Sequence, residues 1–357
     1  MKKIAIGALL TVLLAAALSF AFRETIAMRV MQRVVAQNLT SSPLTELPDG
    51  LHVGLCGAGS PLPDVDRSGP CVAVIAGGKL YIVDSGAGSS RVLGRMRLRQ
   101  GQIEAAFLTH FHSDHIDGLG EMMLQRWAGG GNAEPLPVFG PPGVERVVAG
   151  FNEAYAQDVV YRVAHHGEAV VPPGGAGGAA RPIDVPAPGA APVIYTDGDL
   201  RVTAFAVDHR PVAPAVGYRF DYKGRSAVIS GDTVKSANLQ AIAKGADLLV
   251  HEALSTELVE VMTRGAADAG VERIEKITVD IVDYHTSPVQ AAETARDAGV
   301  GHLLFYHIVP PLPLAILENV FLKGVADVYS GPVTLGRDGT LIQMPAGSTE
   351  ITASDEL

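Results

Sequence analysis

A short apolar run that ends in a cluster of histidines constrains this chain more than any other feature. Ala105 to Leu108 is typical of a short buried strand, and four potential metal ligands lie within the six positions 110–115. They are His110, His112, Asp114 and His115. Side chains two apart on an extended chain point the same way, so His110 and His112 can bind one ion together. Four ligands this close in sequence do not easily surround one tetrahedral ion. The spacing therefore favours two ions that also use ligands from elsewhere in the chain.

The pattern His-x-His-x-Asp-His at 110–115 resembles the metal-binding signature of the metallo-β-lactamase superfamily. Other stretches are similar to the ribonuclease Z and arylsulfatase branch of that superfamily, and they follow in the expected order. They are Val83-Asp84-Ser85-Gly86, Val207-Asp208-His209-Arg210-Pro211, Ser230-Gly231-Asp232-Thr233 and His251-Glu252-Ala253-Leu254. The resemblance spans roughly residues 51–345 and implies an α/β fold, the four-layer αββα sandwich. Composition and periodicity alone support only a mixed α/β enzyme with two sheets.

The resemblance also implies which side chains bind metal, with Zn²⁺ as the expected ion and two ions per chain. The expected ligands form two sets of three that are joined by one bridging carboxylate. The first set is His110, His112 and His209, the second is Asp114, His115 and His307, and the bridge is Asp232. A carboxylate has two oxygens and can bridge two cations, which an imidazole cannot.

Three residues are candidates for moving protons. In the ribonuclease Z segment that 251–254 resembles, the histidine is a proton donor held by an acid, so we expect His251 to act as the general acid, with Glu252 beside it. Asp114 can accept the proton of the attacking water. His285 is the next candidate for the acid. We expect Asp84 to orient a ligand histidine without binding metal.

These residues predict a dinuclear zinc hydrolase of phosphodiester or sulfate esters, with a hydroxide between the two ions as the nucleophile. One alternative is a tRNA 3′-processing endonuclease like ribonuclease Z, which matches the motifs most closely. Another is a metal-stabilised binding protein of the cell envelope without catalysis. The formal net charge is −10, and lysine is absent from Leu80 to Tyr222. Both facts argue against nucleic acid as a partner and favour a small-molecule ester.

The N-terminus has the pattern of an export signal. Lys2 and Lys3 precede 19 uncharged residues, Ile4 to Phe22, which just reach the length of a membrane span. A cleaved signal peptide and a retained membrane anchor both stay open for residues 1–22. We expect residues 23–48 to form a linker, with a short amphipathic helix, and residues 49–357 to form the hydrolase domain. That domain would lie in the periplasm or cell envelope, in contact with the membrane through residues 4–22.

The chain has two cysteines, Cys56 and Cys71, which flank a stretch rich in glycine and proline. In an exported protein they can form a disulfide. Two separate buried thiols fit the sequence equally well, because cysteine is among the most buried residue types.

Overall fold

The computed structural model describes residues 7, 13 and 18–357, and the chain divides into two units, Met1–Glu46 and Leu47–Leu357. The first unit contains helices α2 (Arg23–Thr40) and α3 (Pro43–Glu46), so most of the expected linker is helical. The predicted signal peptide or anchor lies largely outside the described residues. Among those that are described, no helix is both long and apolar enough to cross a membrane.

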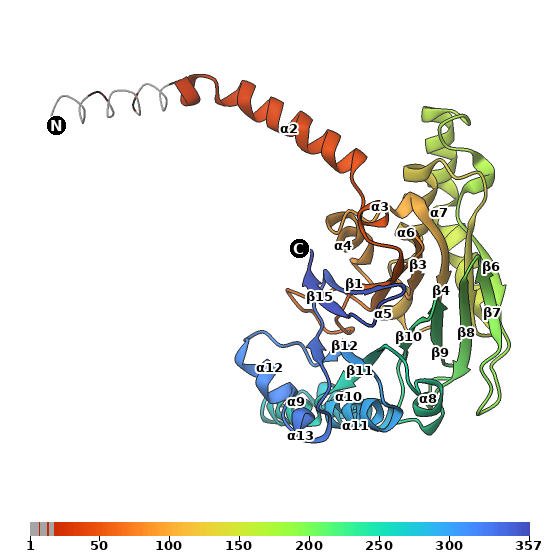
Figure 1. Ribbon diagram of the computed structural model, residues 1–357, viewed down its shortest axis with the longest axis vertical. Coiled ribbons are helices and arrows are strands. Elements are labelled where there is room, and N and C mark those ends of the chain that lie inside the picture. Colours follow the sequence, from red (N-terminus) through yellow and green to blue (C-terminus); the bar gives the residue numbers. More distant parts are fainter. Residues whose placement is uncertain (1–6, 8–12, 14–17) are drawn as a thin grey trace. The chain divides into compact units, whose positions relative to one another are not determined.

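The second unit contains two sheets, which Figure 1 shows with helices on their outer sides. The first sheet has the order β15-β14-β1-β2-β3-β4-β5-β6, and the second has the order β13-β12-β11-β10-β9-β8-β7. The strands are β1 (Gly50–Gly57), β2 (Cys71–Ala76), β3 (Lys79–Val83), β4 (Ile103–Phe107), β5 (Leu136–Gly140), β6 (Gly178–Pro182), β7 (Val193–Asp197), β8 (Leu200–Ala206), β9 (Val216–Tyr222), β10 (Arg225–Ile229), β11 (Leu248–Leu254), β12 (His302–Val309), β13 (Val333–Leu335), β14 (Thr340–Pro345) and β15 (Thr352–Asp355).

The helices of the second unit follow the strands in the order of a layered α/β protein. They are α4 (Ser89–Arg95), α5 (Ser113–Ile116), α6 (Leu119–Gly130), α7 (Val144–His166), α8 (Ala237–Ile242), α9 (Thr256–Asp268), α10 (Glu272–Asp280), α11 (Pro288–Ala298), α12 (Ile316–Phe321) and α13 (Val325–Val328), with short 3₁₀ turns η1 (Gln100–Gln102), η2 (Pro173–Gly175) and η3 (Ile281–Tyr284).

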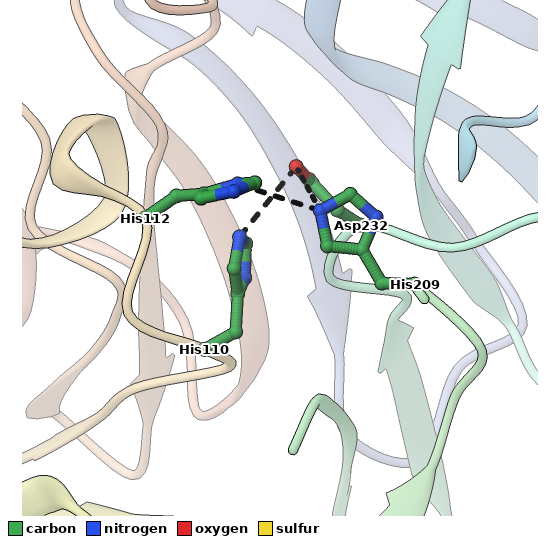
Figure 2. A group of neighbouring side chains, drawn as sticks. All are labelled: His110, His112, His209 and Asp232. Atoms are coloured by element: carbon green, nitrogen blue, oxygen red, sulfur yellow. Dashed lines mark hydrogen bonds and ion pairs between the residues drawn. The ribbon is translucent and has the colours of Figure 1, made fainter. Parts of the chain in front are cut away.

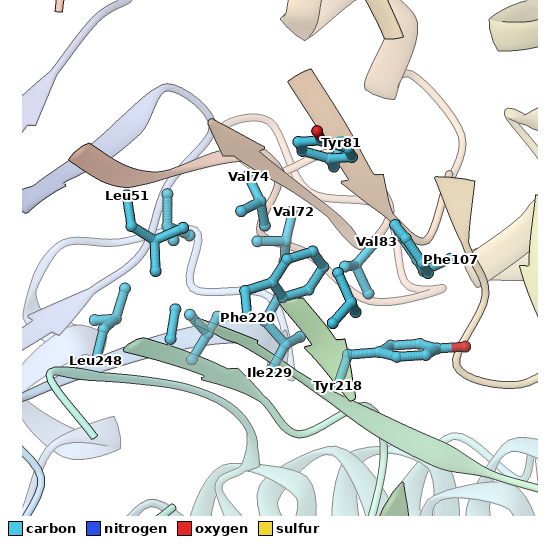
Figure 3. Close-up of a cluster of buried hydrophobic side chains, with 14 of the residues drawn as sticks. Leu51, Val72, Val74, Tyr81, Val83, Phe107, Tyr218, Phe220, Ile229 and Leu248 are labelled. Atoms are coloured by element: carbon cyan, nitrogen blue, oxygen red, sulfur yellow. The ribbon is translucent and has the colours of Figure 1, made fainter. Parts of the chain in front are cut away.

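The core lies between the two sheets. Figure 3 shows side chains of the first sheet, including Leu51 and Val72, facing Tyr218 and Phe220 of the second. A second apolar cluster covers the other face of the second sheet, where Ala295 of α11 packs with strand residues. The predicted αββα sandwich is confirmed. Period-two alternation in half-buried strands and near-continuous apolar runs in central strands both lead to this arrangement.

Residues 152–200 are more regular than their composition alone indicates. Their glycine and proline content predicts a long irregular loop, but the segment continues α7 to His166 and then supplies β6 and β7. Strand β6 pairs in parallel with β5, and β7 pairs antiparallel with β8. Pairing with a preformed sheet edge overrides weak local strand preference. His165 and His166 are exposed at the end of α7 and lie outside the site described below.

The structure answers the question that the sequence left open for the cysteines. Cys56 and Cys71 are joined by a disulfide between the end of β1 and the start of β2. Both residues are fully buried.

Candidate metal centre

The histidines and aspartates singled out by the sequence converge where strands of both sheets end. His110 and His112 follow β4, Asp114 and His115 lie on the short helix α5, and the others come from the second sheet. His209 follows β8, Asp232 follows β10, and His307 lies near the end of β12. Strand ends are where an α/β sheet can present polar side chains without interrupting its ladder of hydrogen bonds.

The first expected ligand set is brought together. His110, His112, His209 and Asp232 each place one possible ligand atom within 4.8 Å of the others, as Figure 2 shows. His209 Nε2 lies 3.4 Å from His112 Nδ1, and His110 Nε2 lies 3.8 Å from Asp232 Oδ2. The four donors are nitrogen and oxygen atoms of the kinds that bind zinc.

The second expected set is also brought together. Asp114, His115 and His307 place one possible ligand atom each within 4.8 Å of the others. Asp114 Oδ2 is 3.2 Å from His307 Nε2 and 3.6 Å from His115 Nε2. The structure therefore brings the members of each predicted set together, and it also places Asp232, His285 and His307 within 4.8 Å of one another.

Asp232 lies between the two sets. Its Oδ2 atom is 3.3 Å from Nε2 of both His115 and His307, and 3.8 Å from Nε2 of both His110 and His209. Buried polar atoms without hydrogen-bond partners include Nε2 of His110, Nε2 of His115 and Oδ1 of Asp232. Such atoms are costly to leave unsatisfied, and divalent cations at this position would satisfy them. The donor set therefore fits bound metal.

Hydrogen bonds hold the ligand imidazoles in place from behind. Asp84 Oδ2 is 2.8 Å from His115 Nδ1 and also accepts from the hydroxyl of Thr109, while Asp84 Oδ1 accepts from the Thr109 N–H. The carbonyl of Tyr284 lies 2.9 Å from His209 Nδ1. Because these bonds use Nδ1 of His115 and of His209, the Nε2 atoms of the two rings face the centre of the cluster. The orienting role predicted for Asp84 agrees with this contact.

The backbone at two site residues is in the left-handed region. Asp84 has a φ of 59° and His307 has a φ of 45°, which side chains with a β-carbon rarely adopt. Such conformations cost free energy and are common at functional sites, where the surrounding structure holds them.

The clustered charges shift the pKa values of the site. Burial, followed by the neighbouring charge of His115, lowers the pKa of His110 well below its usual value. Burial alone would raise the pKa of Asp232, but His307 and His115 lower it well below its ordinary value. Burial would lower the pKa of His115, but Asp232 and Asp114 raise it well above its usual value. Asp232 is thus ionised at neutral pH, as a metal ligand must be.

The side chains of His251 and Glu252, which are neighbours on β11, point to opposite faces of the strand. Adjacent residues of a strand point to opposite faces, and in β11 this alternation sends the Glu252 carboxylate to the site. The His251 ring is fully buried, its Nδ1 donates to the carbonyl of Glu252, and its Nε2 has no hydrogen-bond partner. It does not line the cavity beside the ligands. This placement does not favour the predicted role of His251 as proton donor.

His285 occupies the place that the sequence assigned to His251. Its Nδ1 lies 3.2 Å from Glu252 Oε2, and its ring lines the cavity beside the ligands. Backbone N–H groups of Thr233 and Thr286 donate to Glu252 Oε1 and fix the carboxylate. In the sequence, residues 285–288 indicate the start of a helix, and the capping box of Ser287 at α11 confirms it. Nothing in this local pattern indicates that His285 contacts Glu252.

Comparison with known proteins adds a family and close relatives. Residues 81–308 match the model of the Beta-lactamase superfamily domain. Ribonuclease Z of Mycobacterium avium (strain 104) is 38% identical over 300 residues, which are 84% of this chain and 100% of the relative. Ribonuclease Z of Mycolicibacterium gilvum is 39% identical over 299 residues, 83% of this chain and 97% of the relative.

Solved structures share the fold. The short form of human tRNase Z matches with a TM-score of 0.58 and 22% identity, over 82% of this chain and 99% of that chain. The metallo-β-lactamase fold protein YhfI from Bacillus subtilis matches with a TM-score of 0.57 and 18% identity, over 82% of this chain and 99% of that chain.

These relatives correct two predictions. The prediction that nucleic acid is not the partner, and a small-molecule ester is, was wrong, because the close relatives are named as ribonucleases. The prediction of a periplasmic or envelope location, with membrane contact through residues 4–22, was also wrong, because the close relatives are named Ribonuclease Z. Net charge misled the first prediction because it averages over the whole surface and does not describe the field at one site.

Proposed function

The chain belongs to the β-lactamase superfamily and is a metal-dependent hydrolase, and we propose that it is a phosphodiesterase of the ribonuclease Z type that processes the 3′ ends of tRNA precursors. The observation that carries the chemistry is the position of Asp232 between two sets of ligands. The identity of the substrate rests on relatives that align over nearly their whole length at 37–39% identity.

The seven clustered residues would hold two zinc ions. When bound, two zinc ions lower the pKa of a water molecule and neutralise the oxygens of a phosphoryl group under attack. Each ligand set supplies three side chains of its own, and the carboxylate of Asp232 lies close enough to contribute negative charge to both. The carboxylate of Asp114 faces the same space and can accept a proton from the attacking water.

His285 is the group that protonates the leaving oxygen. It lines the cavity beside the ligands, and a ring nitrogen lies within 4.8 Å of the ligand atoms of Asp232 and His307. Burial lowers the pKa of His285, but the charge of Glu252 and its hydrogen bond raise it above the usual value overall. The imidazole is therefore protonated over a wider range of pH than a free histidine, which suits a general acid.

The test is an assay of purified, zinc-loaded protein on a tRNA precursor with a 3′ trailer. We expect one cut that releases the trailer, and no cut in the matched tRNA without a trailer. A parallel reaction with p-nitrophenyl sulfate separates phosphodiester from sulfate ester hydrolysis. The Asp232→Ala variant is the control for a contaminating nuclease, because it should lose the cut. Intact precursor after incubation with fully loaded protein would refute the proposal.

A further inference from the structure

Helix α4 and the turn after it carry positive charge in a chain whose formal net charge is −10. The segment from Ser85 to Ile103 contains four arginines and neither an aspartate nor a glutamate. Arg91 and Arg95 are one helical turn apart and exposed, whereas Val92 and Leu93 of the same helix are buried. The solvent side of α4 therefore presents two neighbouring guanidinium groups.

These two arginines are not engaged with other side chains. Neither guanidinium forms an ion pair or a hydrogen bond with any residue that the structure describes, whereas Arg97 and Arg99, which follow, make contacts of their own. Every other exposed lysine or arginine described in residues 47–357 pairs with an acid or is the one unpaired cation of its element. Arg91 and Arg95 are thus the pair of cations that is available to an anionic partner.

The start of α4 adjoins the metal centre. The Ser85 N–H donates to the carbonyl of His115, and the Gly118 N–H donates to the carbonyl of Ser85. Gly88, which directly precedes α4, lines a depression of about 400 Å³ that also contains Asp114. At 1.5 Å per residue, the helix extends for about 10 Å beyond this point. The two arginines therefore lie beside a path along which a polymer can continue from the metal cluster.

Two depressions flank Asp114, and their walls differ. The cavity that also contains His285 is mostly apolar, and α10 forms part of its wall. The depression toward α4 is lined mainly by small and polar residues, with no aromatic ring among them. Proteins bind single-stranded RNA by stacking its bases on aromatic side chains, whereas they bind an RNA duplex through phosphates and 2′-hydroxyls. The α4 side therefore fits the backbone of a duplex.

Acidic residues restrict where phosphates can lie on this side. Asp117 lines the depression at the start of α4, and Asp66 and Asp355 line a smaller one beside Arg95. Asp66 is paired with Arg337, which lines the smaller depression too. These carboxylates stand near the two ends of α4. The phosphate contact is therefore placed over the exposed side of the helix, between them.

We propose that Arg91 and Arg95 of α4 hold phosphates of the RNA duplex that adjoins the cleaved bond. The inference rests on the proposed function, because it assumes that the scissile phosphate lies at the metal cluster. Contacts to phosphates position a nucleic acid without reading its sequence, so both arginines are positioning residues. A chain with a net charge of −10 can hold a polyanion in this way, because the local field of two unpaired cations faces the substrate.

The test is a binding measurement that needs no turnover. Fluorescence anisotropy on the zinc-loaded full chain compares a short blunt RNA duplex with a single-stranded RNA of the same length. The double variant Arg91→Gln/Arg95→Gln should bind the duplex about 10-fold more weakly at low salt. The slope of log Kd against log salt concentration should become less steep by about 2, since each phosphate contact contributes about 0.9. Unchanged affinity and slope would overturn the proposal.

A second double variant removes the same charge from the far side of the second sheet. Arg201 and Lys244 are exposed and lie at the starts of β8 and β11, whereas His209 and Glu252 lie toward the opposite ends of those strands. Arg201→Gln/Lys244→Gln should change the duplex affinity less than about twofold. An equal loss in both double variants would show that only net charge matters and would exclude a contact at α4. A loss confined to single-stranded RNA would overturn the assignment to a duplex.

Turnover separates this inference from the proposed function. On the tRNA precursor, the α4 variant should raise KM about tenfold and leave kcat unchanged, and its rate on bis(p-nitrophenyl) phosphate should equal that of the wild type. If duplex affinity falls as expected but the wild-type protein leaves the precursor intact, the proposed function fails and the α4 surface stands. If the wild type cuts the precursor and the variant does so with unchanged KM, the surface fails and the function stands.

Discussion

Replacing His285 by alanine separates proton donation from metal binding. The His285 ring lies between a carboxylate and the metal cluster. Its Nδ1 is 3.2 Å from Glu252 Oε2, and a ring nitrogen lies within 4.8 Å of ligand atoms of Asp232 and His307. As a positioned general acid, it accounts for about 10² to 10⁴ of the rate when the leaving group is an alkoxide. His285→Ala should therefore cleave the tRNA precursor slower by that factor and keep both zinc ions.

The substrate series makes this prediction sharp. Bis(p-nitrophenyl) phosphate releases a p-nitrophenolate, which leaves without a proton, so the same variant should be slowed far less on it. Zinc content by elemental analysis and rates on both substrates are the measurements. His165→Ala is the matched control, because His165 is exposed at the end of α7, and it should change neither quantity. Equal slowing on both substrates, or loss of one zinc, would refute the role of His285 as acid.

The pH dependence gives an independent check. Burial lowers the pKa of His285, but the charge of Glu252 raises it, so that the pKa lies above the ordinary histidine value of 6.5. An acid must be protonated to act, so the rate on the RNA substrate should fall as the pH rises through this raised value. In Glu252→Gln the raising charge is gone, and the fall should move to lower pH. A fall at the same pH in both proteins would show that another group titrates.

The other predictions concern the metals, an orienting carboxylate and the disulfide. Elemental analysis should find two zinc ions per chain, and Asp232→Ala should lose both zinc and turnover; a single ion at saturation would contradict the two-site arrangement. Asp84→Asn should weaken zinc affinity or activity about 10- to 100-fold, since the carboxylate that orients His115 is lost, and a variant with unchanged zinc binding and rate would count against that role. Replacing both Cys56 and Cys71 by alanine should lower the free energy of unfolding by about 3 kcal/mol, from the loop of 15 residues that the disulfide closes, as measured by urea unfolding; an unchanged midpoint would show that the bond adds no stability.

The sequence alone determined the features that depend on short-range spacing. His110 and His112 are two apart after an apolar run, Asp114 and His115 follow on one helical turn, and any fold that ends a strand there presents them together. His209, Asp232 and the αββα sandwich followed from the resemblance of ordered motifs to the metallo-β-lactamase superfamily. Composition and periodicity alone supported only a mixed α/β enzyme with two sheets.

Only the tertiary structure decided which side chains face the site from distant segments. Strand alternation in β11 sends Glu252 to the centre and His251 away from it, and the sequence does not say which of two neighbours faces which layer. The contact of Glu252 with His285 joins residues 33 positions apart, and the disulfide of Cys56 depends on the pairing of β1 with β2. The apolar cavity likewise exists only because α10 packs beside the metal cluster. Local patterns specify elements and their ends, whereas the faces that meet are set by how the layers pack.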